Sequence, residues 1–311
     1  MRICPITYEP HEGPSEYSLK GLKLLSPRLK NLQPLSLTAA ELLRASEAAA
    51  SKLSIQGVQP KISAVLDVKG EVLKIVERKG RFILKPQIER WKHVPENEDL
   101  TMRLAAAVGI EVPLHGLIRA ADGGFVYFIK RFDRTGRGAR IHVEDFAQLS
   151  GENRDTKYQS SMERVAEIIK EFCSFPLLEH QRLFERTLFS FLTGNEDMHL
   201  KNFSLMTRDG KRELTPAYDL LNSTMVLANP KEEFALPLNG KKKNLTKKDL
   251  LTSFAAERLG LNENVRGDVL RRFRDARASW DRLIDRSFLT ADEQARYRDI
   301  LNGRWARVFG H

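Results

Sequence analysis

The sequence has few cysteines and no long apolar run. Its only cysteines among 311 residues are Cys4 and Cys173, far apart in the chain. Two cysteines supply neither a zinc cluster by themselves nor a disulfide framework, so we expect two ordinary thiols in a reducing cytoplasm. No apolar stretch approaches the roughly 20 residues that cross a bilayer, so we expect no membrane partner. Residues 1–20 contain Pro, His and Glu where a secretory signal needs an apolar segment, so we expect no such signal.

A glycine-rich phosphate-binding motif is also missing. Residues 54–61, SIQGVQPK, precede the first expected strand and contain one glycine, Gly57. This segment matches neither the glycine-rich loop of ordinary protein kinases nor a P-loop. A loop of backbone N–H groups can still fold over phosphates. By itself, however, the segment is a weak signal.

Basic residues exceed acidic ones, and the formal net charge is +10. Such a charge raises encounter rates with anionic partners, without indicating whether these are nucleic acids, nucleotides or acidic proteins. Much of the excess lies in residues 241–248 (KKKNLTKK) and 271–274 (RRFR). Binding of an anionic partner is one interpretation of these two runs. Plain exposure to solvent, in a loop and on a helix face respectively, explains them equally well.

The order of the expected elements indicates an α+β protein with two lobes. Residues 1–50 look like an N-terminal extension that becomes helical near 38–50, where Thr38 and Glu41 suit a capping box. Residues 51–135 form a β-rich lobe and residues 136–311 a mostly helical lobe. We expect strands at 62–68, 71–77, 81–85, 116–118 and 124–129, a helix at 97–108, and further helices at 162–172, 177–193, 248–259, 265–275 and 291–308.

The clearest chemistry lies in residues 194–202, GNEDMHLKN, between an apolar helix and a short strand at 203–205. Asn202 follows Asp197 by five residues, which is the spacing of a phosphotransferase catalytic loop. There the Asp accepts a hydrogen bond from the attacking hydroxyl, and the Asn amide oxygen reaches a metal ion on the phosphates. Asp219, further along in PAYDL, is a second oxygen ligand of the kind that Mg²⁺ takes when phosphates supply the rest.

Each of these residues alone has a plainer explanation, because Asp and Asn in loops are more often caps or turn residues. The ordered set is far more specific than any single member. We therefore predict Asp197, His199 and Lys201 as catalytic-loop residues, with Asn202 and Asp219 as metal ligands.

Two further segments suit nucleotide binding. Lys85 ends an apolar strand within FILKP, where it can contact ATP phosphates, and Glu98 opens a helix and can pair with it. A snorkelling lysine and a glutamate favoured by the helix dipole are the alternative. The segment FIKRFDR at 128–134 lies where two lobes join and can meet adenine, although Arg131 and Asp133 suit a structural ion pair equally well.

These segments together resemble the HipA-like kinases, the toxins of bacterial toxin–antitoxin modules. The resemblance covers roughly residue 53 to the C-terminus. It implies a protein-kinase-like two-lobed HipA fold, ATP and Mg²⁺ as cofactors, and serine/threonine protein kinase activity. It rests on SIQGVQPK, FILKP, NEDLTMRLAAAVGIEVP, IKRFDR, EDFAQLSG, GNEDMHLKNFSL and PAYDL.

The resemblance also implies roles for individual residues. Asp197 corresponds to the catalytic base, and Asn202 and Asp219 to the Mg²⁺ ligands. Ser54 falls where this family has an autophosphorylated serine, and modification there would add about two negative charges beside the ATP phosphates. The nucleotide-binding residues that it implies are Ile55, Gln56, Gly57, Val58, Gln59, Lys85, Glu98, Lys130 and Phe132.

The sequence departs from full-length HipA proteins in two respects. Only about fifty residues precede Ser54, where HipA proteins have an additional subdomain, so the chain resembles the shorter HipT relatives. In such systems a separate small protein, HipS, corresponds to that subdomain, and a HipB-like DNA-binding antitoxin completes the operon, so that DNA is met only through the antitoxin. In addition, Lys130 replaces an acidic residue of HipA. The substrates that the family implies are aminoacyl-tRNA synthetases.

Two other function classes remain open at this stage. A catalytically weak ATP-binding component of a repressor complex would explain the basic surface, but such a protein is expected to have lost at least one of Lys85, Asp197, Asn202 and Asp219. A small-molecule kinase shares the Asp–Asn spacing, and only the resemblance of SIQGVQPK and IKRFDR disfavours it.

Overall fold

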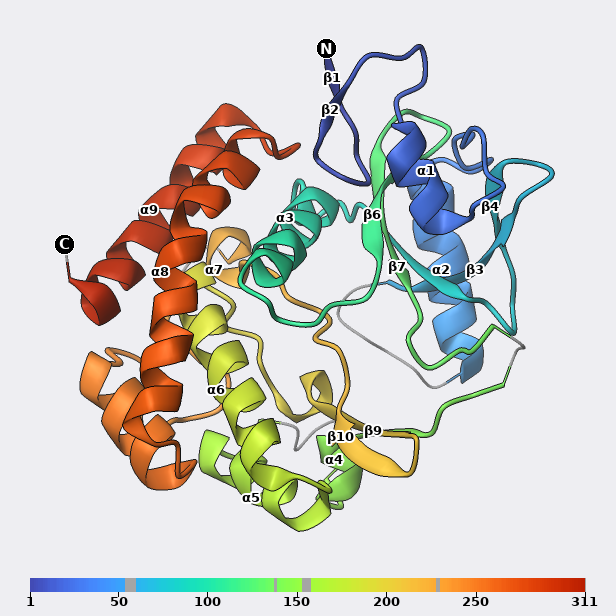
Figure 1. Ribbon diagram of the computed structural model, residues 1–311. Helices are drawn as coiled ribbons and strands as arrows, with labels where there is room; N and C mark the ends of the chain where they lie inside the picture. The colour runs from blue at the N-terminus through green and yellow to red at the C-terminus, as the bar shows by residue number, and fades with distance from the viewer. Residues whose placement is uncertain (54–59, 137–138, 153–157, 228–229, 311) are drawn as a thin grey trace. The chain divides into compact units, whose positions relative to one another are not determined.

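The computed structural model describes residues 1–53, 60–136, 139–152, 158–227 and 230–310. The chain forms two compact units (Figure 1). The first unit contains residues 1–100, 113–134 and 285–290, and the second contains residues 101–112, 135–284 and 291 onward. The division passes through one helix, α3 (Val94–Ala107).

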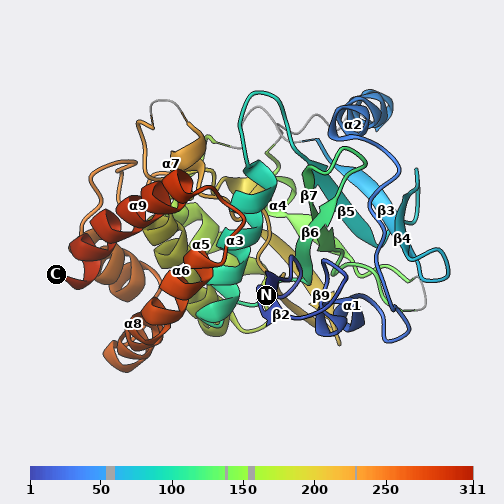
Figure 2. The same cartoon turned by 90° about the horizontal axis from the view of Figure 1, so that it is seen from above.

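The first unit is built on a five-stranded antiparallel sheet with the strand order β4-β3-β5-β7-β6 (Figure 2). All five strands expected from the sequence are present, with small differences at their ends. Their bounds are β3 Ile62–Asp67, β4 Val72–Ile75, β5 Phe82–Pro86, β6 His115–Arg119 and β7 Phe125–Lys130.

The two faces of this sheet serve different purposes. Side chains alternate between the faces of a strand. In β5, Phe82 and Leu84 belong to the apolar core cluster of the unit, so Lys85 lies on the opposite face. The register pairs Lys85 directly with Tyr127 of β7 on that face. The sheet therefore separates an apolar core from a face that carries a charged side chain.

The first fifty residues contribute to the core of this unit. Two short strands, β1 (Arg2–Ile3) and β2 (Pro10–His11), precede two helices, α1 (Leu19–Leu25) and α2 (Ala39–Leu53). The expected capping box is present at the start of α2, because the Thr38 N–H donates to Glu41 Oε2 at 2.8 Å and the Glu41 N–H donates to Thr38 Oγ1 at 3.3 Å. The residues of this region that join the core cluster are Cys4, Ile6, Tyr17, Leu22, Leu25, Leu29, Leu32, Leu35 and Leu42.

The second unit is mostly helical and has a three-stranded sheet with the order β10-β9-β8, of which Figure 1 labels β9 and β10. Its strands are β8 Val143–Asp145, β9 Ser204–Arg208 and β10 Lys211–Leu214. Its α-helices are α4 Phe146–Leu149, α5 Met162–Phe172, α6 Pro176–Thr193, α7 Ser223–Val226, α8 Glu263–Asp285 and α9 Ala291–Phe309, with a short 3₁₀-helix, η1 (Leu200–Asn202), and a π-helix, η2 (Asp249–Arg258).

Three helices differ from the sequence expectation. Helix α3 begins at Val94, three residues earlier than expected, so Glu98 lies in its second turn and does not open it. The helix expected at 265–275 continues to Asp285, because Trp280 and Ile284 extend its buried stripe at helical spacing. The helix expected at 248–259 is wound as a π-helix, in which the Leu259 N–H donates to the Phe254 carbonyl five residues earlier. No helix in the described part of the chain is long and apolar enough to span a membrane.

Trp280 of α8 lies at the centre of the aromatic core of the second unit. Its ring contacts Phe189 of α6 and Trp305 of α9 edge to face, with centroid separations of 5.7 and 6.1 Å. The indole N–H donates to the Leu104 carbonyl at 2.9 Å, near the C-terminal end of α3, where backbone carbonyls lack helical partners. Trp280 therefore holds three helices of this unit together.

Replacing Trp280 by Phe should destabilise the protein, because the Leu104 carbonyl loses its donor and the smaller ring leaves a gap. We expect the free energy of unfolding to fall by about 1–3 kcal/mol in chemical denaturation. As a control, Leu178→Ala truncates a side chain that is 60% exposed and should change stability by less than about 0.5 kcal/mol. Equal effects of the two substitutions would contradict the central position of Trp280.

Candidate active site

Helix α6 delivers the chain to the segment that carries the predicted catalytic residues. Pro176 stands at its first turn, where a missing N–H costs nothing, and the helix is buried from Leu183 to Thr193. Gly194 ends the helix in the left-handed conformation, with φ 74°. A Cβ at this position would lie 2.7 Å from Asn222 Oδ1 and 3.0 Å from Thr224 Oγ1. Glycine is therefore required both by the backbone angle and by the close packing.

The loop after Gly194 is closed by hydrogen bonds around the main chain of Asp197. The Asn202 side-chain amide donates to the Asp197 carbonyl at 2.7 Å, and the His199 N–H donates to the same oxygen at 2.9 Å. Asn195 Oδ1 accepts a hydrogen bond from the Asp197 N–H at 3.3 Å. Because Asn202 uses its amide nitrogen in this way, its amide oxygen is the atom left for the predicted metal contact.

The side chains of the loop divide sharply by burial. Asp197 is exposed, whereas Glu196 and Met198 on either side of it are buried. His199 is also buried and immediately precedes η1, and the partly buried Lys201 lies within η1. The Asp197 carboxylate is thus presented to solvent by a loop whose neighbouring side chains are fixed.

Glu196 attaches the loop to two other segments of the second unit. Its carboxylate accepts hydrogen bonds from Thr224 Oγ1 at 2.5 Å and from the Arg304 guanidinium of α9 at 3.3 Å. Its backbone N–H donates to Ser223 Oγ at 2.7 Å. Burial raises the pKa of Glu196, and the hydrogen bond from Thr224 and the charge of Arg304 oppose that shift only in part.

The segment that contains Asp219 is tied to the same loop. The Tyr218 hydroxyl donates to the Lys201 carbonyl at 3.0 Å and lies 2.6 Å from Ser204 Oγ. These contacts connect the neighbour of Asp219 to the residue before Asn202, so both predicted metal ligands stand on segments that are joined to each other. Asp219 itself has φ 55°, a left-handed conformation that non-glycine residues adopt rarely and often at functional sites.

The predicted metal ligands are one amide side chain, Asn202, and one carboxylate, Asp219. Among the described residues there is no group of three or more His, Cys, Asp or Glu side chains able to hold a metal ion. Mg²⁺ bound together with nucleotide phosphates takes only one or two carboxylates from the protein. One amide oxygen and one carboxylate, on segments joined through Tyr218, therefore fit Mg²⁺ held jointly with phosphates and do not fit a metal site made by protein alone.

The nucleotide-binding residues predicted in the first unit centre on Lys85. Its ammonium group lies 2.5 Å from Glu98 Oε1 of α3 and 5.6 Å from the centre of the Tyr127 ring. Lys85 and Glu98 are 2% and 1% exposed, respectively. The ion pair expected from the sequence is therefore present. It is buried, unlike the snorkelling lysine of the alternative interpretation, and the role of Lys85 toward ATP remains a prediction.

The segment after β7 contains an ion pair between Arg131 and Asp133, which was one of the two interpretations that the sequence allowed. Arg131 contacts Asp133 with two nitrogens, at 2.9 and 2.7 Å. Although burial opposes it, the pKa of Asp133 is lowered by the hydrogen bonds and charge of Arg131 and by the charge of Arg134. Lys130 is the last residue of β7 and its N–H donates to the Leu114 carbonyl at 2.7 Å, and Phe132 is partly buried. Contact of Lys130 and Phe132 with adenine remains a prediction.

Ser54 and the predicted phosphate-binding residues Ile55–Gln59 lie outside the described residues. The structure adds contacts that sequence reasoning missed. Arg304 stands more than a hundred residues after Glu196 and carries no local signal, and Tyr158, whose hydroxyl donates to Asp197 Oδ1, belongs to no motif. Such contacts depend on the folded chain and not on spacing in the sequence.

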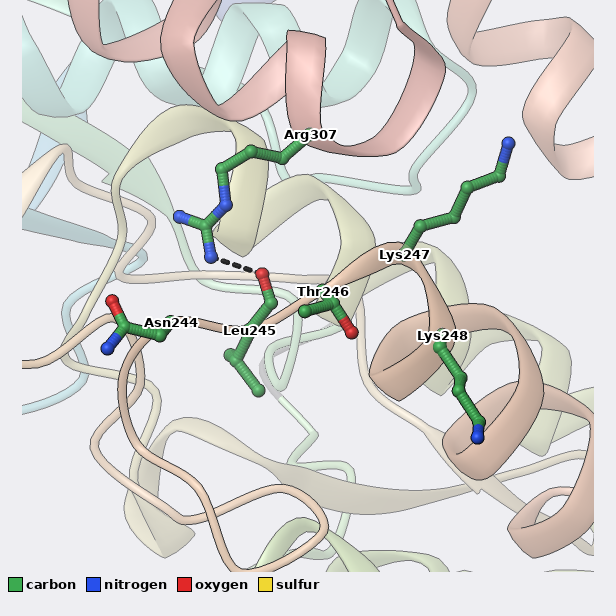
Figure 3. Close-up of a pocket in the computed structure, with 6 residues that line it drawn as sticks. All are labelled: Asn244, Leu245, Thr246, Lys247, Lys248 and Arg307. Carbon is green, nitrogen blue, oxygen red and sulfur yellow. Dashed lines mark hydrogen bonds between the residues drawn. The ribbon is translucent and has the colours of Figure 1, made fainter.

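The lysine-rich run at 241–248 borders a pocket of about 570 Å³ (Figure 3). Arg307 of α9 donates to the Leu245 carbonyl there, while the side chains of Lys247 and Lys248 point away from each other (Figure 3). Lys241 pairs with Asp249 at 2.9 Å. Of the predicted site residues that the structure describes, none lines this pocket, whose lining is Asn244, Leu245, Thr246, Lys247, Lys248 and Arg307.

Comparison with known proteins identifies the family. Residues 53–280 match the model of the HipA-like C-terminal domain. A protein of Haemophilus influenzae named "Putative kinase" is 30% identical over 305 residues, which cover 85% of each chain. The chain belongs to the HipA-like kinase family.

HipA of Shewanella oneidensis is similar to this chain in both sequence and structure. The serine/threonine-protein kinase toxin HipA is 30% identical over 200 residues, which cover 56% of this chain and 44% of that protein. A solved structure of HipA with HipB and operator DNA aligns with a TM-score of 0.71 over 91% of this chain and 73% of that one, at 24% identity. This likeness confirms the expected kinase-like HipA fold.

Gly194 provides a first test of the catalytic loop. Gly194→Ala places a Cβ against Asn222 and Thr224 at a positive φ angle, so we expect a loss of about 1–3 kcal/mol in unfolding free energy. The matched control is Gly303→Ala in α9, where a Cβ meets nothing within 4 Å and should stabilise the helix by about 0.5–1 kcal/mol. Effects of the same sign in the two variants would contradict the assigned geometry.

The buried pair gives a second test. Lys85→Met removes the cationic partner of Glu98 and should cost about 3–5 kcal/mol of stability at neutral pH, measured by urea denaturation. The comparison is Lys74→Met, which breaks the 2.6 Å pair with Asp67 on an exposed lysine and should cost less than about 1 kcal/mol. If Lys85→Met proves as mild as Lys74→Met, the pair does not carry buried charge.

Proposed function

We propose that this HipA-like chain is an ATP- and Mg²⁺-dependent serine/threonine protein kinase. The observation that carries the proposal is the exposed carboxylate of Asp197, held in a loop that Asn202 closes through the Asp197 carbonyl. This arrangement suits a residue that must receive an external hydroxyl while a neighbouring amide faces a phosphate-bound metal. Two named relatives support the same class of reaction: a protein of Haemophilus influenzae named "Putative kinase" and the serine/threonine-protein kinase toxin HipA of Shewanella oneidensis.

Each predicted residue has a place in the proposed reaction. The acceptor hydroxyl donates a hydrogen bond to Asp197, its oxygen forms a bond to the γ-phosphorus, the bond to ADP breaks, and the hydroxyl proton passes to Asp197. Mg²⁺, when bound, would neutralise phosphate charge, and Asn202 and Asp219 would hold it. Lys85, kept in place by Glu98, would contact the ATP phosphates. His199 and Lys201 complete the catalytic loop, while Ile55–Gln59 would cover the phosphates and Lys130 and Phe132 would meet adenine.

The biological role that we propose is that of a toxin in a toxin–antitoxin module. The Shewanella HipA structure contains HipB and its operator DNA, which supports a HipB-like DNA-binding antitoxin as partner. We also propose a HipS-like small protein as a partner, as the HipT-type resemblance of the sequence implies. Because the family resemblance implies an aminoacyl-tRNA synthetase as substrate, we propose this class of target, with autophosphorylation at Ser54 as the regulatory step.

The activity is tested with purified chain, labelled ATP and a cell extract, comparing the unmodified protein with Asp197→Asn. We expect label in at least one protein, and a decrease of about 10²–10⁴-fold in Asp197→Asn because the base is lost while the side-chain shape is kept. Removal of Mg²⁺ by a chelator should abolish transfer, and added Mg²⁺ should restore it. Mapping of labelled peptides tests Ser54 and identifies the target protein.

The control for this experiment is Asp209→Asn. Asp209 is exposed, lies between β9 and β10 with φ 50°, and Asn tolerates that backbone conformation equally well. This variant should therefore retain full transfer. Absence of any Asp197-dependent label in protein would refute the kinase assignment, and label in a small metabolite alone would replace it with a small-molecule kinase.

A further inference from the structure

Tyr158 is attached to the catalytic loop by two contacts, although the sequence analysis gave it no role. Its hydroxyl donates to Asp197 Oδ1 at 2.9 Å. Its ring meets the ring of His199 edge to face, with centroids 5.1 Å apart and an interplanar angle of 79°. Both partners belong to the loop that ends at Asn202, yet Tyr158 precedes that loop by nearly forty residues and lies just before α5. The position of the phenol is therefore set by tertiary structure.

The contact with Tyr158 restrains the side chain of Asp197, which the other hydrogen bonds of the loop do not restrain. The hydrogen bonds from Asn202 and His199 hold the Asp197 carbonyl and leave its side chain unconstrained. An exposed aspartate can rotate about two side-chain bonds, and a base that must meet an incoming hydroxyl gains when one orientation is preferred. A donor on Oδ1 selects such an orientation and leaves Oδ2 to accept the hydroxyl of the substrate.

Tyr158 is suited to donate a hydrogen bond to Asp197 and is unsuited to take the substrate proton in its place. Burial, followed by the negative charge of Asp197, raises the pKa of Tyr158 above its usual range. The phenol thus keeps its proton at neutral pH, and it does not become a phenolate that could accept the substrate proton or repel the carboxylate. Its contact with the buried His199 ring gives the donor a fixed support.

We propose that Tyr158 is a positioning residue that orients the Asp197 carboxylate through Oδ1 and reserves Oδ2 for the acceptor hydroxyl. The proposal rests on the proposed function, in which Asp197 is the base. It predicts that Tyr158 acts on the chemical step through Asp197 and contributes little to ATP binding or to stability.

The test compares Tyr158→Phe with the unmodified chain in Mg²⁺- and ATP-dependent phosphotransfer. This substitution removes the hydroxyl and keeps the ring that contacts His199. We expect kcat to fall about tenfold, with the KM for ATP changed less than about twofold, because a hydrogen bond to a charged group at the reacting centre is lost. The temperature of thermal unfolding should remain close to that of the unmodified chain.

Tyr297→Phe is the matched control. Tyr297 is fully buried, and its hydroxyl lies 3.0 Å from Thr101 Oγ1 in the same unit. Loss of that hydroxyl should lower the unfolding temperature and leave kcat unchanged. The two phenylalanine variants therefore separate an effect on the base from the general cost of removing a tyrosine hydroxyl.

A double variant decides whether Tyr158 acts through Asp197. In an Asp197→Asn background, Tyr158→Phe should reduce the residual transfer by less than about twofold, because no base remains to be oriented. An equal fold-loss in both backgrounds would show a merely structural role and overturn the proposal. An unchanged or increased kcat in Tyr158→Phe also overturns it, while Asp197-dependent transfer by the unmodified chain would keep the proposed function intact. Absence of that transfer overturns both.

Discussion

The hydrogen bonding and ion pairing of the buried Glu196 carboxylate are the interactions on which the predicted catalytic loop depends. A carboxylate out of water is costly unless it is hydrogen-bonded and paired, and here Thr224 and Arg304 supply those partners. Thr224 stands just beyond the segment of Asp219, and Arg304 stands in the last helix of the chain. One acidic side chain therefore links the loop to two distant segments. The contacts of Glu196 therefore help to fix the position of Asp197, the exposed residue that immediately follows it.

The geometry around Glu196 is tightly constrained at two positions, and one of them is strained. Gly194 turns the chain with a positive φ angle, which glycine adopts easily, directly against Asn222 and Thr224, whereas Asp219 adopts a positive φ angle without being glycine. A non-glycine residue keeps such a conformation only where surrounding contacts determine it. The buried helix α6 and the Tyr218 hydroxyl, bonded to the Lys201 carbonyl, supply those contacts. The stability of the helical unit thus maintains the unfavourable backbone of the site.

The first unit also contains a buried charge, the ammonium group of Lys85, that depends on its partner. Lys85 and Glu98 are almost completely buried, on the sheet face opposite the apolar core. Desolvation makes such a pair expensive, so it adds little to stability relative to apolar residues of the same size, whereas removal of one partner is costly. A buried pair of this kind is better explained by the need to hold an ammonium group in one place than by a gain in folding energy.

The sequence alone determined the residues whose roles depend on local spacing. The interval between Asp197 and Asn202, the strand that ends at Lys85 and the capping box at Thr38 all follow from short-range geometry, which is encoded within a few residues. The strands of the five-stranded sheet and the longer helices could be predicted for the same reason, whereas the short strands β1, β2, β8 and β10 were not. The π-helical winding of η2 and the extension of α8 could not, because they depend on which faces the rest of the chain buries. Only the tertiary structure decided that Arg304 supports Glu196 and that Tyr158 reaches Asp197, since hydrogen bonds between distant segments form where the folded chain brings them together and leave no periodic pattern in the sequence.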